Sequence, residues 1–376
     1  MKSLFLTFRP IYEESGISKK IIAQYNAFRS LGFDMKLCKM VIEKSGRYSY
    51  VIDDKVVCNL GKGVRAKISL YTKYKEIAEY VKKHNIKYVY IRYVLNATPS
   101  FLRFLSDLKE SGAVLFLEIP TYPYDKELQN GIVSKVQLLV EKRCRKYFKK
   151  YIDRIITYTD LSHIYGVPCV NISNSVDINS IRLRHPKPHK GFVMVGVAQL
   201  APWHGYDRII RGISEYYKKG GKERVVFYII GNGAKFIKEY QELSSELDVA
   251  DHVYCEGMKS GGELDEYFDV ADFAIGCLAC HRKNVFKVKS LKNVEYASRG
   301  IPFIYSEMND DFDNQSYVLK ESADESPVDI NKIIHFVNML KMSPLEIRET
   351  IKNTLTWDAQ MLKVSNVLKK ITDEKN

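Results

Sequence analysis

The sequence predicts an α/β protein with two domains, each built on a parallel sheet. Short apolar or β-branched segments alternate with amphipathic segments along most of the chain, which is the pattern of strands joined by helices. The 376 residues are enough for two domains of ordinary size. Between the two sets of segments, residues 182–190 are basic, contain two prolines and lack periodicity, so they predict a linker.

The first domain is expected over residues 1–181. Five segments are predicted to be strands: residues 3–8, 35–40, 88–91, 114–119 and 154–158. Four amphipathic segments are predicted to be helices: residues 19–31, 71–84, 100–111 and 133–151. This order predicts a parallel sheet with helices on both of its faces.

The second domain is expected over residues 191–356. Residues 192–197 are predicted to form a strand that leads through a loop into an amphipathic helix, and residues 225–230 a strand that runs into a glycine turn. A short helix is expected over residues 290–300, before the apolar run 303–305. Further helices are expected over residues 327–341, 344–355 and 357–371. Parallel strands place the loops that follow them along one edge of the sheet, where ligands bind.

The net charge of the chain is +13, and its position along the chain is informative. Residues 1–180 hold 30 Lys and Arg residues against 17 Asp and Glu, whereas residues 181–376 hold 28 of each. A basic domain joined to a neutral one suggests that the first half faces something anionic: a bilayer, a nucleic acid or an acidic substrate.

Residues 133–152 form a basic amphipathic segment that is the leading candidate for this contact. Its apolar side chains stand at positions 133, 136, 140, 147, 148 and 151. Its cations are Lys135, Lys142, Arg143, Arg145, Lys146, Lys149 and Lys150. We expect the apolar stripe to pack inward while the cations face the headgroups of an anionic membrane. The alternative is that the cations are only solvated.

The seven cysteines are scattered and odd in number, which favours a reducing compartment over a disulfide framework. Cys277 and Cys280 form a CxxC at the end of an apolar run, which favours buried thiols over redox or metal chemistry. Residues 4–8 are too short for a signal peptide, and no apolar run approaches the ~18 residues of a membrane span. We therefore expect a cytoplasmic protein without a spanning helix.

Four segments of the second domain carry candidate donor-binding residues. The loop that contains Gln199, His204 and Gly205 precedes a helix whose first N–H groups suit a phosphate, although it can also be an ordinary loop with Trp203 as a lid. Gly231 and Gly233 allow either a backbone approach to a nucleotide or a tight turn.

Arg282 follows a strand. Its guanidinium could bind a diphosphate with two hydrogen bonds, and the alternative is that it lies in a surface loop. Lys292 and Glu295 share one face of a helix that Ser290 is expected to cap. Glu295 is placed to accept two hydrogen bonds from a ribose diol, as the acid of dinucleotide-binding folds does. The alternative is a solvated ion pair.

In the first domain, Gly16 follows the first strand and allows either a backbone approach to a ligand or a plain turn. Glu118 begins the proline-stiffened run 118–127, where either a catalytic or a structural role is open. Asp311 and Asp313 form a DxD that resembles a metal–nucleotide motif, but a surface loop is favoured. Since the histidines do not converge on a metal pattern, we expect no metal and no cofactor besides the donor substrate.

The order of these segments resembles the family 4 glycosyltransferases of the GT-B fold, most closely from position 174 to 302. Residues 174–177, Asn-Ser-Val-Asp, resemble the family's Asn-Gly-Val-Asp. Residues 197–205 resemble its V-G-R-L-x-P-x-K-G loop, and residues 292–302 resemble its K-x-x-E-Y-x-A-x-G-x-P segment. The final helix, residues 357–376, resembles the one that crosses back onto the first domain.

The resemblance implies two Rossmann-like domains facing across a cleft, and retaining transfer of a hexose from a UDP- or GDP-sugar. The acceptor would be a growing, lipid-linked glycan at the cytoplasmic membrane face. Glu295 would hold the ribose, and the loop 199–205 with Gly16, Gly231 and Gly233 would surround the diphosphate and base. Glu118, His204 and Arg282 are the candidate catalytic residues.

The sequence departs from the family pattern at the phosphate site. Gln199 and His204 stand where relatives have arginine and lysine, and Lys287 stands where relatives have a glutamate. We expect Arg282, Lys287 or Lys292 to compensate for the missing cations. Two other readings remain: a catalytically silent relative, motivated by these departures, and a nucleic-acid-binding protein, motivated by the pI of about 9.1. The neutral second half and the lack of a recognised binding module argue against nucleic acid.

Overall fold

The computed structural model describes residues 1–12, 15–125 and 132–374, with side chains from residue 134 onward in the last range. The chain forms two compact units. Unit 1 comprises Met1–Ser173 and Trp357–Asn376, and unit 2 comprises Asn174–Thr356. Residues 182–190, predicted to be a linker, thus belong to unit 2. None of the described helices is long and apolar enough to cross a bilayer.

The described part of unit 1 contains a nine-stranded sheet with the order β4-β3-β2-β1-β5-β6-β7-β9-β8. The strands are β1 (Lys2–Thr7), β2 (Asp34–Ile42), β3 (Arg47–Ile52), β4 (Lys55–Lys62), β5 (Tyr88–Arg92), β6 (Val114–Ile119), β7 (Arg154–Thr157), β8 (His163–Ile164) and β9 (Val167–Asn171). Its central strands are parallel, while the β3–β4 hairpin and β8 add antiparallel edges.

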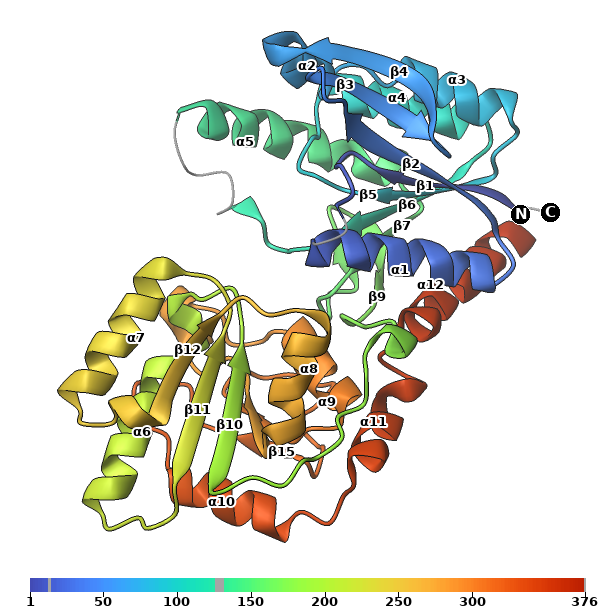
Figure 1. The fold of residues 1–376 in the computed structure, drawn as a ribbon. Helices are drawn as coiled ribbons and strands as arrows, with labels where there is room; N and C mark the ends of the chain where they lie inside the picture. Colours follow the sequence, from blue (N-terminus) through green and yellow to red (C-terminus); the bar gives the residue numbers. More distant parts are fainter. Residues whose placement is uncertain (13–14, 126–131, 375–376) are drawn as a thin grey trace. The chain divides into compact units, whose positions relative to one another are not determined.

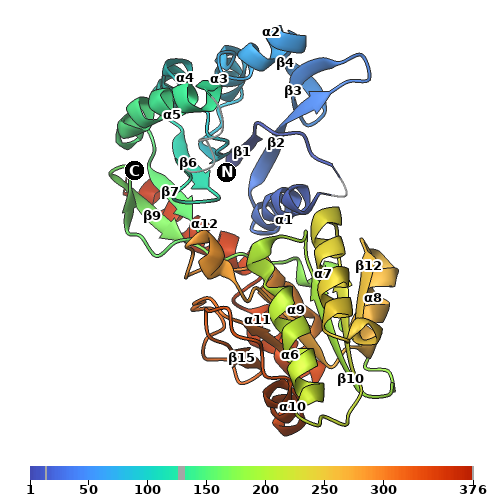
Figure 2. The same cartoon turned by 90° about the vertical axis from the view of Figure 1, so that its left-hand side faces the viewer.

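Helices cover both faces of this sheet, as the sequence predicts. α1 (Gly16–Ser30) and α12 (Trp357–Asp373) lie side by side on one face (Figures 1 and 2). The opposite face carries α3 (Lys75–Lys83), α4 (Pro99–Glu110) and part of α5 (Ile132–Cys144), while α2 (Gly63–Ser69) follows β4. Side chains of β1 alternate between the two cores: Phe5 packs with α1 and α12, and Leu4 and Leu6 pack with α3 and α4.

Unit 2 is built on a parallel sheet with the order β12-β11-β10-β13-β14-β15. The strands are β10 (Phe192–Val197), β11 (Val225–Ile230), β12 (Val253–Gly257), β13 (Phe273–Ile275), β14 (Phe303–Tyr305) and β15 (Val318–Lys320). α6 (Tyr206–Lys218), α7 (Ala234–Glu246) and α10 (Ile330–Met339) cover one face (Figures 1 and 2). α8 (Gly261–Val270), α9 (Leu291–Arg299) and α11 (Pro344–Lys352) cover the other.

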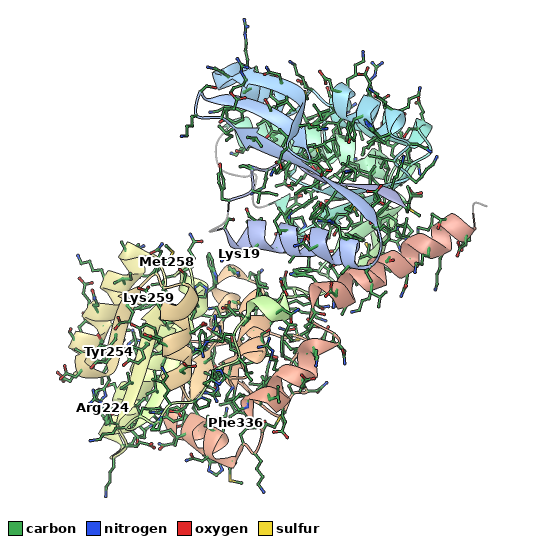
Figure 3. All side chains as sticks on the ribbon, turned by 45° about the vertical axis from the view of Figure 1, so that its right-hand side comes forward. Lys19, Arg224, Tyr254, Met258, Lys259 and Phe336 are labelled. Carbon is green, nitrogen blue, oxygen red and sulfur yellow. The ribbon has the colours of Figure 1, made fainter. Side chains whose placement is uncertain are left out.

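The strand order of unit 2 reverses at β10, and this reversal places the candidate site. From β10 the chain proceeds outward to β11 and β12, and then returns to the other side of β10 with β13. In open α/β sheets the ligand-binding crevice lies at the carboxyl ends of the strands where the order reverses, so the carboxyl ends of β10 and β13 are the candidate site. Figure 3 labels a residue at each end of these strands: Arg224 lies just before β11, at the amino end, and Met258 lies just after β12, at the carboxyl end.

The segment 182–190 differs from the predicted linker because it is bound to unit 2 along its length. Arg182 forms ion pairs with Asp265 and Asp269, at 3.0 and 2.8 Å. Arg184 donates to the carbonyl oxygens of Ala271 and Gly300. The arginines of this segment bind unit 2. A basic composition with two prolines was therefore not a reliable sign of a linker.

The predicted helix 133–151 is also interrupted. α5 ends at Cys144, and residues Arg145–Lys150 form a 3-10 helix. The buried side chains of this region are Glu141, Cys144 and Phe148, whereas Val136, Val140 and Tyr147 are exposed. The prediction that the apolar stripe packs inward is therefore wrong for three of its members.

Candidate functional site

The loop after β10 is joined to the loop after β13 by main-chain hydrogen bonds. Leu278 N donates to His204 O at 3.0 Å, and Ala279 N donates to Trp203 O at 3.1 Å. Gly205 makes this approach possible: its φ is +66°, and a Cβ there would lie 2.9 Å from the Cβ of Leu278. The structure thus brings the predicted segments 199–205 and 277–283 together at the strand reversal of unit 2.

His204 is a buried, neutral donor in this loop. Its Nδ1 accepts a hydrogen bond from Ala201 N at 3.0 Å, so the ring hydrogen is on Nε2. Burial, and to a lesser extent the nearby Lys292 ammonium, lowers the pKa of His204 to about 3. The positive charge that protonation would add is therefore absent at neutral pH. Gln199, the second departure from the family loop, is exposed.

Gly231 and Gly233 are required by the packing of the protein's own loops. Their φ angles are +141° and +142°. A Cβ on Gly231 would lie 1.6 Å from Ala198 O, and one on Gly233 would lie 2.8 Å from the Cβ of Leu200. Leu200 N also donates to Asn232 O at 2.7 Å. These contacts explain both glycines without a nucleotide.

Arg282 is held by two carboxylates, which differs from the expected diphosphate clamp. Its Nη1 and Nη2 donate to Asp207 at 2.9 and 2.7 Å, and its Nε donates to Glu325 at 3.0 Å. A further bond from Nη1 reaches Pro202 O at 2.9 Å. With these partners the guanidinium fastens the loop after β13 to the start of α6, and a phosphate would have to displace them.

Lys292 is the cation that the structure places at the strand reversal. It lies in the first turn of α9, and its Nζ donates to Tyr206 OH at 3.1 Å. Among the described residues, no carboxylate forms an ion pair with Lys292. Lys287 instead pairs with Asp310 at 2.6 Å and is exposed.

Glu295 lies one turn further along α9 and forms a weak pair with Arg299 at 3.4 Å. Its side chain is 32% exposed, so carboxylate surface remains open to a ligand. Ser290 occupies the N-cap position of α9, as predicted, but its side chain makes no capping hydrogen bond. The start of α9 therefore keeps main-chain N–H groups that a phosphate can use.

Gly16 and Glu118 belong to unit 1. Gly16 begins α1, and a Cβ on this residue would meet no described atom within 4 Å. Glu118 is fully buried and accepts hydrogen bonds from Arg92 at 2.6 Å and from Tyr158 at 2.7 Å. Burial alone raises its pKa, but Arg92 and Lys20 outweigh burial and lower it. These contacts agree with the structural alternative for Glu118, and its catalytic role stays a prediction; Glu127, at the end of the same run, lies outside the described residues.

The structure also reveals polar residues that the sequence analysis missed. The side chain of Lys20 in α1 is 11% exposed and lies 3.9 Å from Glu118, and desolvation lowers its pKa to about 7. Asn293 and Glu307 are buried at the carboxyl edge of unit 2 with side-chain atoms that lack hydrogen-bond partners. The sequence could have indicated both residues, because Glu307 follows a predicted strand closely and Asn293 lies early in a predicted helix. Asp313 of the DxD is held by Tyr305, Lys320 and Asn309 N, which favours the loop interpretation.

The sequence matches no protein-family model and no curated protein. Solved structures nevertheless share its fold over almost the whole chain. A glycosyltransferase from Rickettsia africae ESF-5 matches with a TM-score of 0.64 and 13% identity, over 99% of this chain and 98% of its own. Sucrose-phosphate synthase from Thermosynechococcus elongatus matches with a TM-score of 0.66 and 12% identity, over 99% of both chains.

The lipopolysaccharide outer core galactosyltransferase WaaB is also similar, with a TM-score of 0.62 and 14% identity, over 98% of this chain and 99% of its own. At these identities the similarity concerns the fold and not the substrates. The fold prediction is confirmed by these matches and by the two parallel-sheet units. The chain therefore has the GT-B fold of glycosyltransferases.

Proposed function

We propose that the protein is a retaining glycosyltransferase that moves a hexose from a UDP- or GDP-sugar onto a growing, lipid-linked glycan. The observation that carries the proposal is the group of donors at the strand reversal of unit 2. Lys292, the Nε2–H of His204 and the uncapped start of α9 lie on the loops and helix that border this crevice. Open α/β sheets bind nucleotides at this position.

These groups suit a departing nucleoside diphosphate. In a retaining transfer that proceeds on one face of the sugar, negative charge develops on the leaving diphosphate oxygens, and fixed donors stabilise it. Lys292 supplies a full charge, while His204 and the N–H groups of α9 supply dipoles. Glu295, one turn from Lys292, is placed to accept hydrogen bonds from the ribose. No metal ion is needed in this arrangement.

The proposal is tested by measuring UDP and GDP binding to the full chain and to Lys292→Met. The exposed Lys238 of α7, which pairs with Glu242 at 3.6 Å, provides a matched Lys→Met control in the same unit. We expect at least tenfold weaker binding for Lys292→Met and no change for Lys238→Met. Equal binding by parent and Lys292→Met would remove this crevice as the donor site. Tight binding without transfer to any glycan would indicate the catalytically silent relative.

We also propose that unit 1 docks peripherally on the cytoplasmic face of an anionic membrane through α5 and the 3-10 helix that follows it. This surface exposes apolar side chains: Val136, Leu139 and Tyr147 are 54%, 68% and 46% exposed. Lys142, Arg143, Lys146, Lys149 and Lys150 lie along the same segment. Apolar groups that enter the interface beside cations that contact headgroups are the features of a membrane-surface helix.

A further inference from the structure

The loops after β13 and β14 bring together two thiols and a carboxylate. Cys277 lies two residues beyond β13, Cys280 begins the short 3-10 helix of the same loop, and Glu307 lies two residues beyond β14. These strands are parallel neighbours, so their carboxyl ends meet at one edge. The two Sγ atoms and a carboxylate oxygen of Glu307 all lie within 4.8 Å of one another.

The three side chains are shielded from solvent and lack sufficient partners. Cys277, Cys280 and Glu307 are 8%, 2% and 1% exposed. Both carboxylate oxygens of Glu307 are buried without a hydrogen-bond partner among the described residues. Lys320 donates to the main-chain oxygen of Glu307 and to Asp313, and not to the Glu307 carboxylate. A buried carboxylate without partners is costly, and a bound cation would offset that cost.

We propose that Cys277, Cys280 and Glu307 bind a thiolate-preferring divalent cation, for which Zn²⁺ is the best fit. Sulfur ligands select zinc over Mg²⁺ or Ca²⁺, and zinc accepts a carboxylate oxygen in the same tetrahedral shell. Ligands at about 2.0–2.3 Å from one ion lie roughly 4 Å or less from one another, so the three atoms need only a small approach. A water completes the fourth position, and the protons of both thiols are released to solvent on binding.

Charge supports the proposal. Two thiolates and one carboxylate around Zn²⁺ offset its double positive charge and leave a single negative charge on the site. Geometry supports it as well, because the two Sγ atoms and a carboxylate oxygen of Glu307 lie within 4.8 Å of one another. The CxxC, predicted to be buried thiols, is buried, but it lies beyond the end of β13 at Ile275.

A cation here would fix the loop whose Leu278 and Ala279 N–H groups bond to the loop after β10. Its role is to hold these loops in place, and it takes no part in the proposed transfer. The inference therefore does not depend on the proposed function, and it can be tested on metal content and spectra alone.

The test uses the full chain, purified with a reductant and without a metal-binding tag. We expect about one zinc per chain by elemental analysis. After metal removal, one equivalent of Co²⁺ should produce thiolate-to-cobalt charge-transfer absorption and raise the melting temperature. Cys277→Ser and Cys280→Ser should each lose the absorption, and Glu307→Gln should weaken binding at least tenfold. Cys255→Ser, a half-buried thiol of β12 in the same unit, is the matched control.

The cobalt spectrum of the unmodified chain keeps the test decisive if a variant fails to fold. Absence of charge-transfer absorption with reduced thiols overturns the proposal. A Cys277–Cys280 disulfide found by mass spectrometry in protein that binds no metal after reduction also overturns it, and assigns the CxxC to redox chemistry. If the cobalt absorption persists in Cys277→Ser and Cys280→Ser, the metal binds at another site and the proposal is overturned.

Discussion

His204 stands where the family that the sequence resembles has a lysine, and its imidazole is neutral because burial lowers its pKa to about 3. This position therefore offers a hydrogen-bond donor without a charge. The Nδ1 of His204 is already occupied by Ala201 N, so Nε2–H is left as a donor of fixed direction. A directed donor can stabilise a diphosphate oxygen, but Lys292 must supply the net charge.

This lowered pKa predicts how stability depends on pH. The unfolded chain binds a proton at His204 near pH 6.5, whereas the folded chain binds it only near pH 3. The stabilisation by neutral His204 is therefore complete above pH 6.5 and is lost progressively as the pH falls towards 3, at no more than about 1.4 kcal/mol per pH unit. His204→Gln should flatten this dependence in denaturant unfolding at pH 4–7. The exposed His335→Gln is the control; equal slopes for parent and His204→Gln would contradict the prediction.

Glu295 carries the second prediction at this scale. Replacing it with alanine should lower donor affinity by roughly 1.5–3 kcal/mol, the range for hydrogen bonds to a charged group. Because Glu295 also pairs with Arg299, the melting temperature of the variant must be measured alongside binding. Glu239→Ala, an exposed carboxylate of α7 paired with Lys235, is the matched control. Unchanged nucleotide affinity in a folded Glu295→Ala protein would exclude Glu295 from the site.

The sequence predicted that Arg282 and Glu118 follow strands at the carboxyl end of a sheet, but it did not show which side chains pair with them. Asp207 and Glu325, which hold Arg282, stand 75 and 43 positions away along the chain. Arg92, which holds Glu118, is 26 positions away and is the last residue of a neighbouring strand. Residue type and strand position predict that a side chain reaches a crevice edge; only tertiary packing decides whether its charge remains available there.

At the scale of elements, hydrophobic periodicity predicted the main strands and helices because their burial is nearly continuous. The predicted segment 225–230 coincides with β11, and 114–119 coincides with β6. The sequence analysis missed the β3–β4 hairpin. Asp53 and Asp54 form its turn, and both have positive φ, as a two-residue hairpin turn of type I′ requires. Asp-Asp is a weaker turn signal than Asn-Gly, so alternation alone did not reveal the hairpin.

The surface of α5 and its 3-10 extension should control membrane binding. Each cation near an anionic bilayer contributes ~1 kcal/mol, and exposed apolar side chains add to this. Neutralising Lys142, Arg143, Lys146, Lys149 and Lys150 should release the protein from phosphatidylserine-containing vesicles without changing nucleotide affinity, and high salt should release the parent. The control neutralises five cations of unit 2: Lys218, Lys222, Lys235, Lys238 and Lys332.

Two outcomes would contradict this prediction. Equal co-sedimentation of the parent and the α5-neutralised protein would exclude this surface, and equal binding of the parent to neutral and anionic vesicles would exclude docking driven by charge. Leu139→Ser separates the two contributions, because it removes the most exposed of the apolar side chains there, at 68%, and leaves every charge in place.

For the whole molecule, charge is divided unevenly, and this bears on how a diphosphate is neutralised. The excess of +13 belongs to residues 1–180, whereas residues 181–376 are balanced. If the proposed donor binds at the strand reversal of unit 2, its diphosphate would be neutralised by local groups, chiefly Lys292 and the start of α9, and not by a general positive field. Asp313 of the DxD is already bound to Lys320 and Tyr305.

From this balance we predict that transfer needs no divalent cation on the diphosphate. Brief EDTA treatment should leave sugar transfer unchanged, and added Mg²⁺ or Mn²⁺ should not stimulate it, because the charge that a metal would supply comes from Lys292 and main-chain N–H groups. Zinc content must be followed in the same samples, since the shielded Cys277–Cys280–Glu307 cluster is expected to keep its ion during a short exposure. Activity that EDTA abolishes and Mg²⁺ or Mn²⁺ restores, at constant zinc content, would instead assign the diphosphate to a metal-dependent site.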